Sequence, residues 1–105
     1  MLEIKKFRDI PWSEIIYDCS WYSVFSPPSP VSIGHQIWVP KEDNMAAVRE
    51  TLTAAYRYTS NIFLKDKRIG YKIIMEYGEC SGAQISWPHI NLIPININSP
   101  EEELS

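Results

Sequence analysis

The chain has 105 residues, of which 45% are hydrophobic and 22% are charged, with a formal net charge of −3. This composition is typical of one soluble globular domain, and the negative charge argues against binding to a long nucleic acid. No apolar run is long enough to cross a membrane, and residues 1–9 are charged and lack the apolar segment of a secretory leader, so we expect a cytoplasmic protein. Cys19 and Cys80 belong to no paired motif, and we expect reduced thiols, no metal site and no cofactor.

The first 40 residues predict a hairpin, a loop and a further strand. Residues 14–18 and 21–25 are short and rich in β-branched and aromatic residues, and the two residues between them are typical of a hairpin. Three prolines in residues 26–34 predict a loop. Residues 35–39 predict the next strand, which Pro40 closes.

One long helix is expected after this strand. Asp43 or Asn44 is a suitable N-cap for it. Apolar residues then recur at spacings of three and four, which is the period of a helix face. They are Met45, Val48, Leu52, Ala55, Tyr56 and Ile62.

The last third of the chain predicts two strands joined by a glycine turn. After a charged turn at residues 64–70, residues 71–77 have the pattern of a buried strand. Residues 78–82 form a turn flanked by glycines, and residues 84–93 predict the second strand. The polar, acidic tail at 96–105 follows. We therefore expect a single domain over residues 1–105, with its core at about residues 10–95.

His89 carries the clearest chemical signal on the predicted strand 84–93. Strand geometry places Trp87, His89 and Asn91 on one face, although Pro88 cannot donate to a neighbouring strand. A neutral imidazole can attack phosphorus when a partner fixes its tautomer and nearby donors hold the phosphate oxygens. Gln84, Asn91 and the amides of the glycine turn are candidate donors. A hydrogen-bonded structural histidine is the alternative interpretation.

Two segments resemble motifs of the histidine triad family. Residues 81–94, SGAQISWPHINLIP, are similar to the family's strand of three alternating histidines, with Trp87, His89 and Asn91 at the three positions. Residues 30–41, PVSIGHQIWVPK, are similar to its proline-rich turn followed by GH, an apolar triplet and PK. Both histidines of the chain, His35 and His89, therefore fall at motif positions.

The resemblance implies an α+β fold, with an antiparallel sheet of about five strands and one main helix. It also implies a homodimer with a continuous sheet, a bound nucleotide or nucleoside phosphate, and a covalent nucleotidyl-histidine on His89. Gln84 and Asn91 would bind phosphate oxygens, and His35 would support them. Ser81 and Trp87 are further candidates for substrate contact. A simple tight turn is the alternative role for Ser81, and a core position is the alternative for Trp87.

Four departures from the family pattern leave two functions open. Trp87 cannot accept a proton, and Asn91 cannot act as an acid or a base near neutral pH. Pro27 stands where the family carries an acidic residue for the ribose, and the carboxylate of Glu76 would repel phosphate. One function is a hydrolase or nucleotidyl transferase acting on a phosphoramidate or a dinucleoside polyphosphate. The other is a nucleotide-binding sensor or interaction module with weakened catalysis.

Overall fold

The structure, a computed structural model, describes residues 1–76 and 78–96, so Tyr77 and most of the predicted acidic tail lie outside the described residues. The described chain contains five strands, one α-helix and two short 3-10 helices. In chain order they are η1 (Phe7–Asp9), β1 (Ile15–Asp18), β2 (Tyr22–Phe25), β3 (Gln36–Pro40), α1 (Met45–Lys65), β4 (Ile69–Met75), η2 (Glu79–Ser81) and β5 (Ile90–Asn96).

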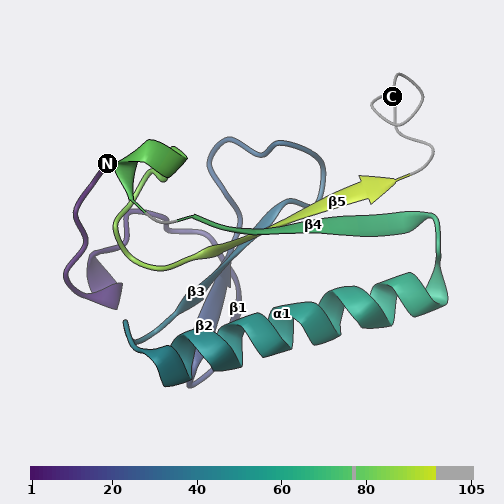
Figure 1. Ribbon diagram of the computed structural model, residues 1–105, viewed down its shortest axis with the longest axis horizontal. Coiled ribbons are helices and arrows are strands. Elements are labelled where there is room, and N and C mark those ends of the chain that lie inside the picture. The colour runs from purple at the N-terminus through teal and green to yellow at the C-terminus, as the bar shows by residue number, and fades with distance from the viewer. Residues whose placement is uncertain (77, 97–105) are drawn as a thin grey trace.

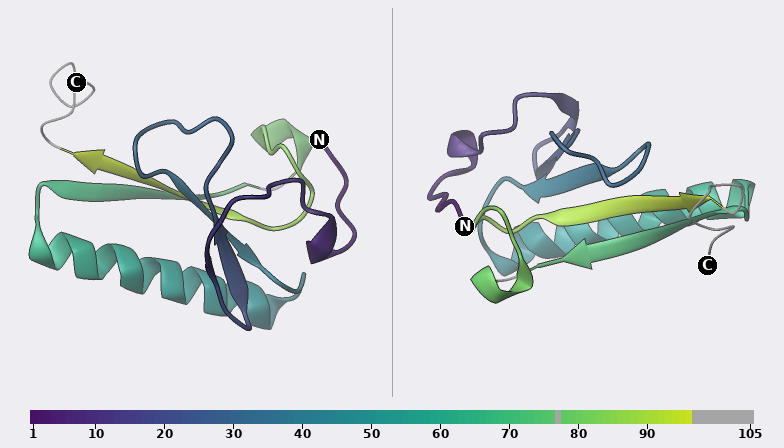
Figure 2. Two further views of the ribbon diagram at one scale, coloured as in Figure 1. Left: turned by 180° about the vertical axis from the view of Figure 1, so that it is seen from behind. Right: turned by 90° about the horizontal axis from the view of Figure 1, so that it is seen from above.

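The five strands form one antiparallel sheet in the order β1-β2-β3-β5-β4. Helix α1 runs along one face of this sheet, and the loop between β2 and β3 lies on the other side together with η2 (Figure 1). The view from behind and the view from above show the same two layers (Figure 2). The expected α+β fold, with five strands and one main helix, is confirmed. No described helix is long and apolar enough to cross a bilayer.

The strand predicted for residues 84–93 begins only at Ile90. Pro88 has no N–H to donate, and the residues before it pair with the N-terminus instead of with the sheet. Ile85 forms an isolated parallel bridge with Leu2, whose N–H donates to the carbonyl of Gln84 at 2.9 Å. Consequently Trp87 and His89 precede β5, and only Asn91 of the three motif positions lies on a strand.

Helix α1 begins after Asn44, whose side-chain oxygen accepts a hydrogen bond from the N–H of Ala47 at 2.8 Å. The face that it buries differs from the predicted one. Of the six apolar positions only Ala55 is fully buried, and Met45 and Tyr56 are 79% and 65% exposed. The buried stripe consists of small residues at four-residue spacing: Ala47, Thr51, Ala55 and Thr59. Small side chains allow the helix to lie close to the sheet, and each threonine hydroxyl donates to a helix carbonyl.

Strand β4 was predicted as a buried strand and is instead an edge strand. It pairs only with β5, and six of its seven residues are half-buried. The apolar run from Ile73 to Met75 therefore covers one flank of the core without being enclosed by it. An edge strand leaves backbone donors and acceptors available for another partner.

Alternating residues of the sheet face two separate apolar clusters. On the α1 side Val24, Trp38, Ile90 and Leu92 pack with Ala55. On the opposite side Phe25, Ile37 and Val39 pack with Ile4, Ile85 and Trp87. Burying an aliphatic side chain stabilises a fold by about 1.5–3 kcal/mol, so both faces contribute to the stability of the sheet. The two faces also carry separate hollows.

Candidate functional site

A hollow of about 190 Å³ lies on the face of the sheet opposite α1, and we call it the His89 hollow. Its floor comes from β3, β4 and β5, where Ile37, Asn91 and Ile74 lie side by side in register. The β2–β3 loop, the turn after β4 and Trp12 form its walls. The lining residues are Trp12, Pro27, Pro28, Ser29, Val31, His35, Ile37, Ile74, Glu76, Gly82, Gln84, His89, Asn91 and Ile93.

His89 lies immediately before β5 and is only 4% exposed, so the hollow is the route by which a ligand would reach its ring. Its Nδ1 lies 2.8 Å from the carbonyl oxygen of Trp87. A carbonyl can only accept, so the proton of the neutral ring is on Nδ1 and the lone pair is on Nε2. The Trp12 ring packs against the imidazole in a T-shaped arrangement, with 5.8 Å between ring centroids. The ring is therefore fixed in orientation and tautomer.

His35 enters the site because the chain turns sharply at Gly34, whose φ of +88° favours glycine. A Cβ at Gly34 would approach Pro94 Cγ at 3.2 Å. The N–H of Val31 donates to His35 Nδ1 at 3.1 Å, so the ring proton is on Nε2. That nitrogen donates to Asn91 Oδ1 at 2.8 Å. His35 therefore orients the Asn91 amide and leaves its NH₂ group as the donor end.

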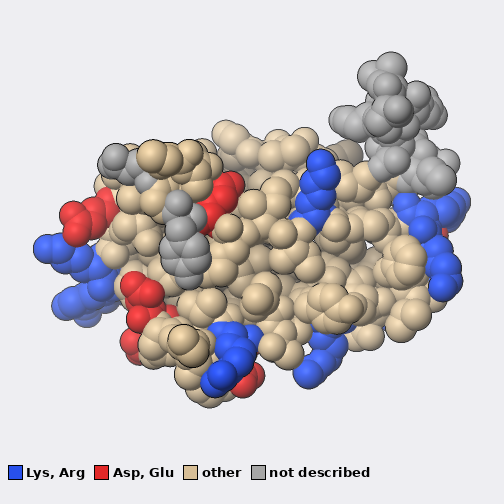
Figure 3. Space-filling view, in the orientation of Figure 1, with Lys and Arg blue, Asp and Glu red and all other residues tan. Residues whose placement is uncertain are grey.

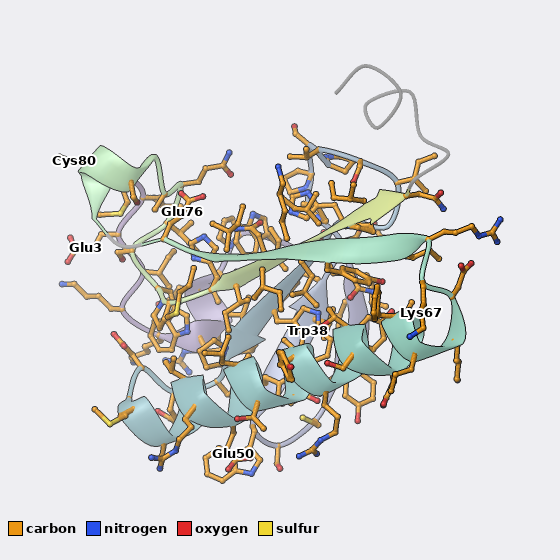
Figure 4. All side chains as sticks on the ribbon, turned by 45° about the vertical axis from the view of Figure 1, so that its right-hand side comes forward. Glu3, Trp38, Glu50, Lys67, Glu76 and Cys80 are labelled. Carbon is orange, nitrogen blue, oxygen red and sulfur yellow. The ribbon has the colours of Figure 1, made fainter. Side chains whose placement is uncertain are left out.

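The turn after β4 contributes both a donor and a negative charge. Gln84, the candidate phosphate ligand, is among the residues that line the hollow. Glu76 lies near η2 and, among the lining residues, is the one charged side chain (Figure 4). A Cβ at Gly82 would lie 4.0 Å from Glu76 Oε2, so the carboxylate packs against the turn. The hollow thus combines neutral hydrogen-bonding groups with one carboxylate.

The structure brings His89, Asn91, His35 and Gln84 together but not the other two predicted site residues. Ser81 is exposed at the end of η2, and its hydroxyl donates to the carbonyl of Gly78 at 2.7 Å. The ring of Trp87 is buried in the cluster around Phe25, where its Nε1–H donates to the carbonyl of Pro40 at 2.8 Å. Neither residue lines the hollow.

Some lining residues carry no signal in the sequence. Trp12 precedes the first strand, and only the packed structure brings its ring against His89. Ser29 and the neighbouring prolines belong to a loop whose path a sequence pattern does not determine. Pro27 was recognised in the sequence as a departure from the family pattern, and it is buried in the wall of the hollow.

Among the described residues, the hollow includes neither the lysine of the PK pair nor a cluster of metal-binding side chains. Lys41, at the PK position of the second motif, pairs with Asp18 at 2.8 Å. This ion pair, together with the Ser23 hydroxyl, holds the pKa of Asp18 below its usual range. Within residues 1–76 and 78–96, no group of three or more histidine, cysteine or acidic side chains could hold a metal ion.

The arrangement of these elements matches solved structures. The histidine triad nucleotide-binding protein from Candida albicans superposes with a TM-score of 0.66 at 17% identity, over 85% of this chain and 69% of its own. A HIT family hydrolase from Clostridium thermocellum superposes with a TM-score of 0.64 at 20% identity, over 89% and 87%. The chain has the histidine triad fold.

A third histidine triad structure agrees with these two. The Hit-like protein involved in cell-cycle regulation from Bartonella henselae gives a TM-score of 0.68 at 18% identity, over 91% of this chain and 83% of its own. At these identities the likeness establishes the fold alone. Neither a protein-family profile nor a curated protein sequence matches the chain.

The hydrogen bonds predict opposite tautomers for the two histidines. At pH 8, where neutral imidazole is the main form of histidine in water, we expect Nδ1–H for His89 and Nε2–H for His35. Long-range ¹H–¹⁵N correlation spectra of the imidazole rings distinguish the two forms, and His89→Ala assigns the signals. The same tautomer in both rings would contradict the geometry described here.

Proposed function

We propose that this chain is a histidine triad-like enzyme that hydrolyses or transfers the nucleotidyl group of a nucleoside phosphate, with His89 as nucleophile. The single observation that carries the proposal is the hydrogen bond from His89 Nδ1 to the Trp87 carbonyl. This bond fixes the lone pair on Nε2 of a ring that lines a hollow of its own. An oriented neutral imidazole is what nucleophilic attack on phosphorus needs.

The proposed reaction has two steps. His89 Nε2 attacks the α-phosphorus, a P–N bond to the ring forms, and the bond from phosphorus to the leaving group breaks. The leaving group departs with the bonding electron pair and takes up a proton. Water or another acceptor then attacks phosphorus, loses a proton, and displaces the ring. Phosphoramidates and dinucleoside polyphosphates are the substrate classes that this sequence of bonds accommodates.

The size of the His89 hollow suits one part of such a substrate. Its volume of about 190 Å³ is below the roughly 300–1,000 Å³ typical of pockets that enclose a small molecule. We assign the hollow to the phosphoryl group and place the ribose and base beyond its mouth. The NH₂ groups of Asn91 and Gln84 would then donate to the phosphate oxygens, as neutral donors do in oxyanion sites.

The second candidate is a nucleotide-binding sensor or interaction module, and one observation favours it. Glu76 contributes a carboxylate to the lining, and none of the described lining residues is a lysine or an arginine that would offset its charge. Like charges repel most strongly where water is partly excluded. A ligand would then bind weakly and reversibly, without the charge stabilisation that turnover normally uses.

We further propose that the chain forms a homodimer through β4 and α1. β4 is an edge of the sheet, and the adjoining face of α1 leaves Leu52, Tyr56 and Phe63 exposed. Much of the surface over α1 and β4 carries neither acidic nor basic side chains (Figure 3). Pairing two β4 strands would satisfy their free backbone groups and bury this apolar face in one step.

The enzyme proposal predicts that His89→Ala lowers the turnover rate of adenosine phosphoramidate and of a dinucleoside polyphosphate more than about a thousandfold. Wild-type protein should gain the mass of an AMP group when quenched during turnover, and the variant should not. His35→Gln is the comparison variant, because it disturbs the site but keeps the nucleophile. Binding of AMP by wild type without turnover or adduct would instead support the sensor.

The charge of Glu76 predicts a direction for affinity. The substitution Glu76→Gln removes the negative charge and should tighten AMP binding by about fivefold, because a carboxylate no longer repels the phosphate. Isothermal titration calorimetry at two salt concentrations measures the gain, which should shrink at high salt. Glu42→Gln is the matched control, since Glu42 is exposed and lies outside the hollow. Equal effects of both substitutions would show that Glu76 does not face the bound phosphate.

The proposed dimer predicts that Tyr56→Glu makes the protein monomeric. A carboxylate at this position would have to lose its hydration in the interface, which is costly for an unpaired charge. Sedimentation equilibrium distinguishes the 12.2 kDa chain from its dimer. Ile33→Glu serves as the control, because Ile33 is 99% exposed in the loop on the other side of the sheet. A wild-type protein that sediments as a monomer would rule out the dimer.

A further inference from the structure

A second and larger hollow lies on the α1 side of the sheet, and we call it the helix-side hollow. Its volume is about 550 Å³, within the range of pockets that enclose small molecules. It exists because α1 packs mainly against β3 and β4 and less against the β1–β2 hairpin on the same face. The groove between α1 and the β1–β2 hairpin is therefore open, with the sheet as its floor.

The two hollows are separated by the sheet. Ile37 on β3 lines the His89 hollow, and the next residue, Trp38, lines the helix-side hollow. Successive side chains of a strand point to opposite faces, so the two sites cannot share a ligand. Figure 4 shows Trp38 between the sheet and α1, whereas Glu76 lies near η2 on the other side. The helix-side hollow therefore needs an explanation apart from the proposed nucleotide chemistry.

Aromatic rings form much of this hollow. Tyr22 stacks on Trp38 with 5.1 Å between ring centroids and 26° between ring planes. Tyr58, from α1, packs against Trp38 at 5.5 Å, and Tyr17, from β1, approaches Tyr22 at 6.1 Å. Such rings attract planar aromatic ligands by stacked or edge contacts. The walls therefore favour a flat, unsaturated compound over a branched aliphatic one.

The polar lining of the hollow combines one cation with neutral side chains: Arg57, Gln36, Asn61 and the tyrosines. Among the described residues that line the hollow, Arg57 is the charged one and none carries a carboxylate to neutralise it. Burial raises the pKa of Tyr22, as does the nearby Cys19, and Arg57 partly offsets the rise, so its charge reaches the aromatic wall. Gln36 Oε1 accepts from Trp38 Nε1 at 3.1 Å, which makes the NH₂ group of Gln36 a donor. Charge and donors thus select an anionic group.

From these contacts we propose that the helix-side hollow binds a planar aromatic compound that carries one anionic group, such as an aryl carboxylate. The ring would pack among Tyr22, Trp38 and Tyr58, and the anion would face the guanidinium of Arg57. Arginine suits both parts of such a ligand, because it pairs with carboxylates and also stacks on aromatic faces. The site is independent of the reaction at His89.

The test uses 2-naphthoate and its neutral analogue 2-naphthylmethanol as probes in an NMR titration of the full chain. The indole N–H of Trp38 reports on the helix-side hollow, and that of Trp87 reports on the other face of the sheet. Trp38→Phe assigns the first signal. We expect 2-naphthoate to shift the Trp38 signal saturably and to leave the Trp87 indole and the His35 and His89 rings unchanged.

The charge preference is the sharper part of the test. Wild type should bind 2-naphthoate about tenfold more tightly than 2-naphthylmethanol, because a charge-assisted hydrogen bond is lost with the alcohol. Arg57→Gln should remove this preference and leave the affinity for the alcohol unchanged. Arg49→Gln is the matched control, since Arg49 is exposed on the same helix but lies outside the hollow.

Three results would overturn the proposal. One is the absence of a saturable shift of the Trp38 signal with 2-naphthoate. Another is a titration that shifts the Trp87 indole or the His89 ring instead, since these lie across the sheet. The third is a preference for the carboxylate that survives in Arg57→Gln or disappears equally in Arg49→Gln.

Discussion

The antiparallel pairing of β3 with β5 is the constraint on which the rest of the structure depends. It joins segments more than 50 residues apart in sequence, and it sets Ile37 opposite Asn91 and Trp38 opposite Ile90. One register therefore fixes which residues face the His89 hollow and which face α1. A shift by one residue would exchange the two faces and separate His35 from Asn91. Both the proposed nucleotide site and the helix-side hollow follow from this single alignment.

The fold could be predicted from the sequence where a local pattern has one structural solution. The hairpin, the proline-rich loop and the cap at Asn44 are of this kind, and each is present. The prediction of the buried helix face was wrong, because periodicity identifies the larger apolar residues but not the surface against which the helix packs. Thr51 is fully buried, whereas Tyr56 is exposed and belongs to the proposed dimer interface. Periodicity does not distinguish an apolar side chain that packs within its own chain from one that a second copy would cover.

The site was harder to predict because its residues are held by contacts with residues that are distant in the sequence. The strand expected over residues 84–93 was wrong at its start. The backbone of Leu2 forms hydrogen bonds with the backbone of Gln84 and Ser86, so these two residues do not pair with the sheet. That rearrangement directs the Trp87 ring into the core while its carbonyl oxygen holds His89. Trp12 is a comparable case, because no spacing in the sequence relates it to His89. The motif positions of His35, His89 and Asn91 indicated residues that line the same hollow, whereas the place of the Trp87 ring was decided by packing.

The difference in charge between the two hollows has a consequence for how each would hold a ligand. The helix-side hollow carries a cation, whose attraction depends weakly on direction. In the His89 hollow the lining donors are neutral amides beside a carboxylate, so an anion there depends on hydrogen bonds, which require alignment. The orientation of the Asn91 amide by His35 therefore matters more than it would in a site with an arginine. On this argument His35 is a positioning residue for the proposed phosphate site.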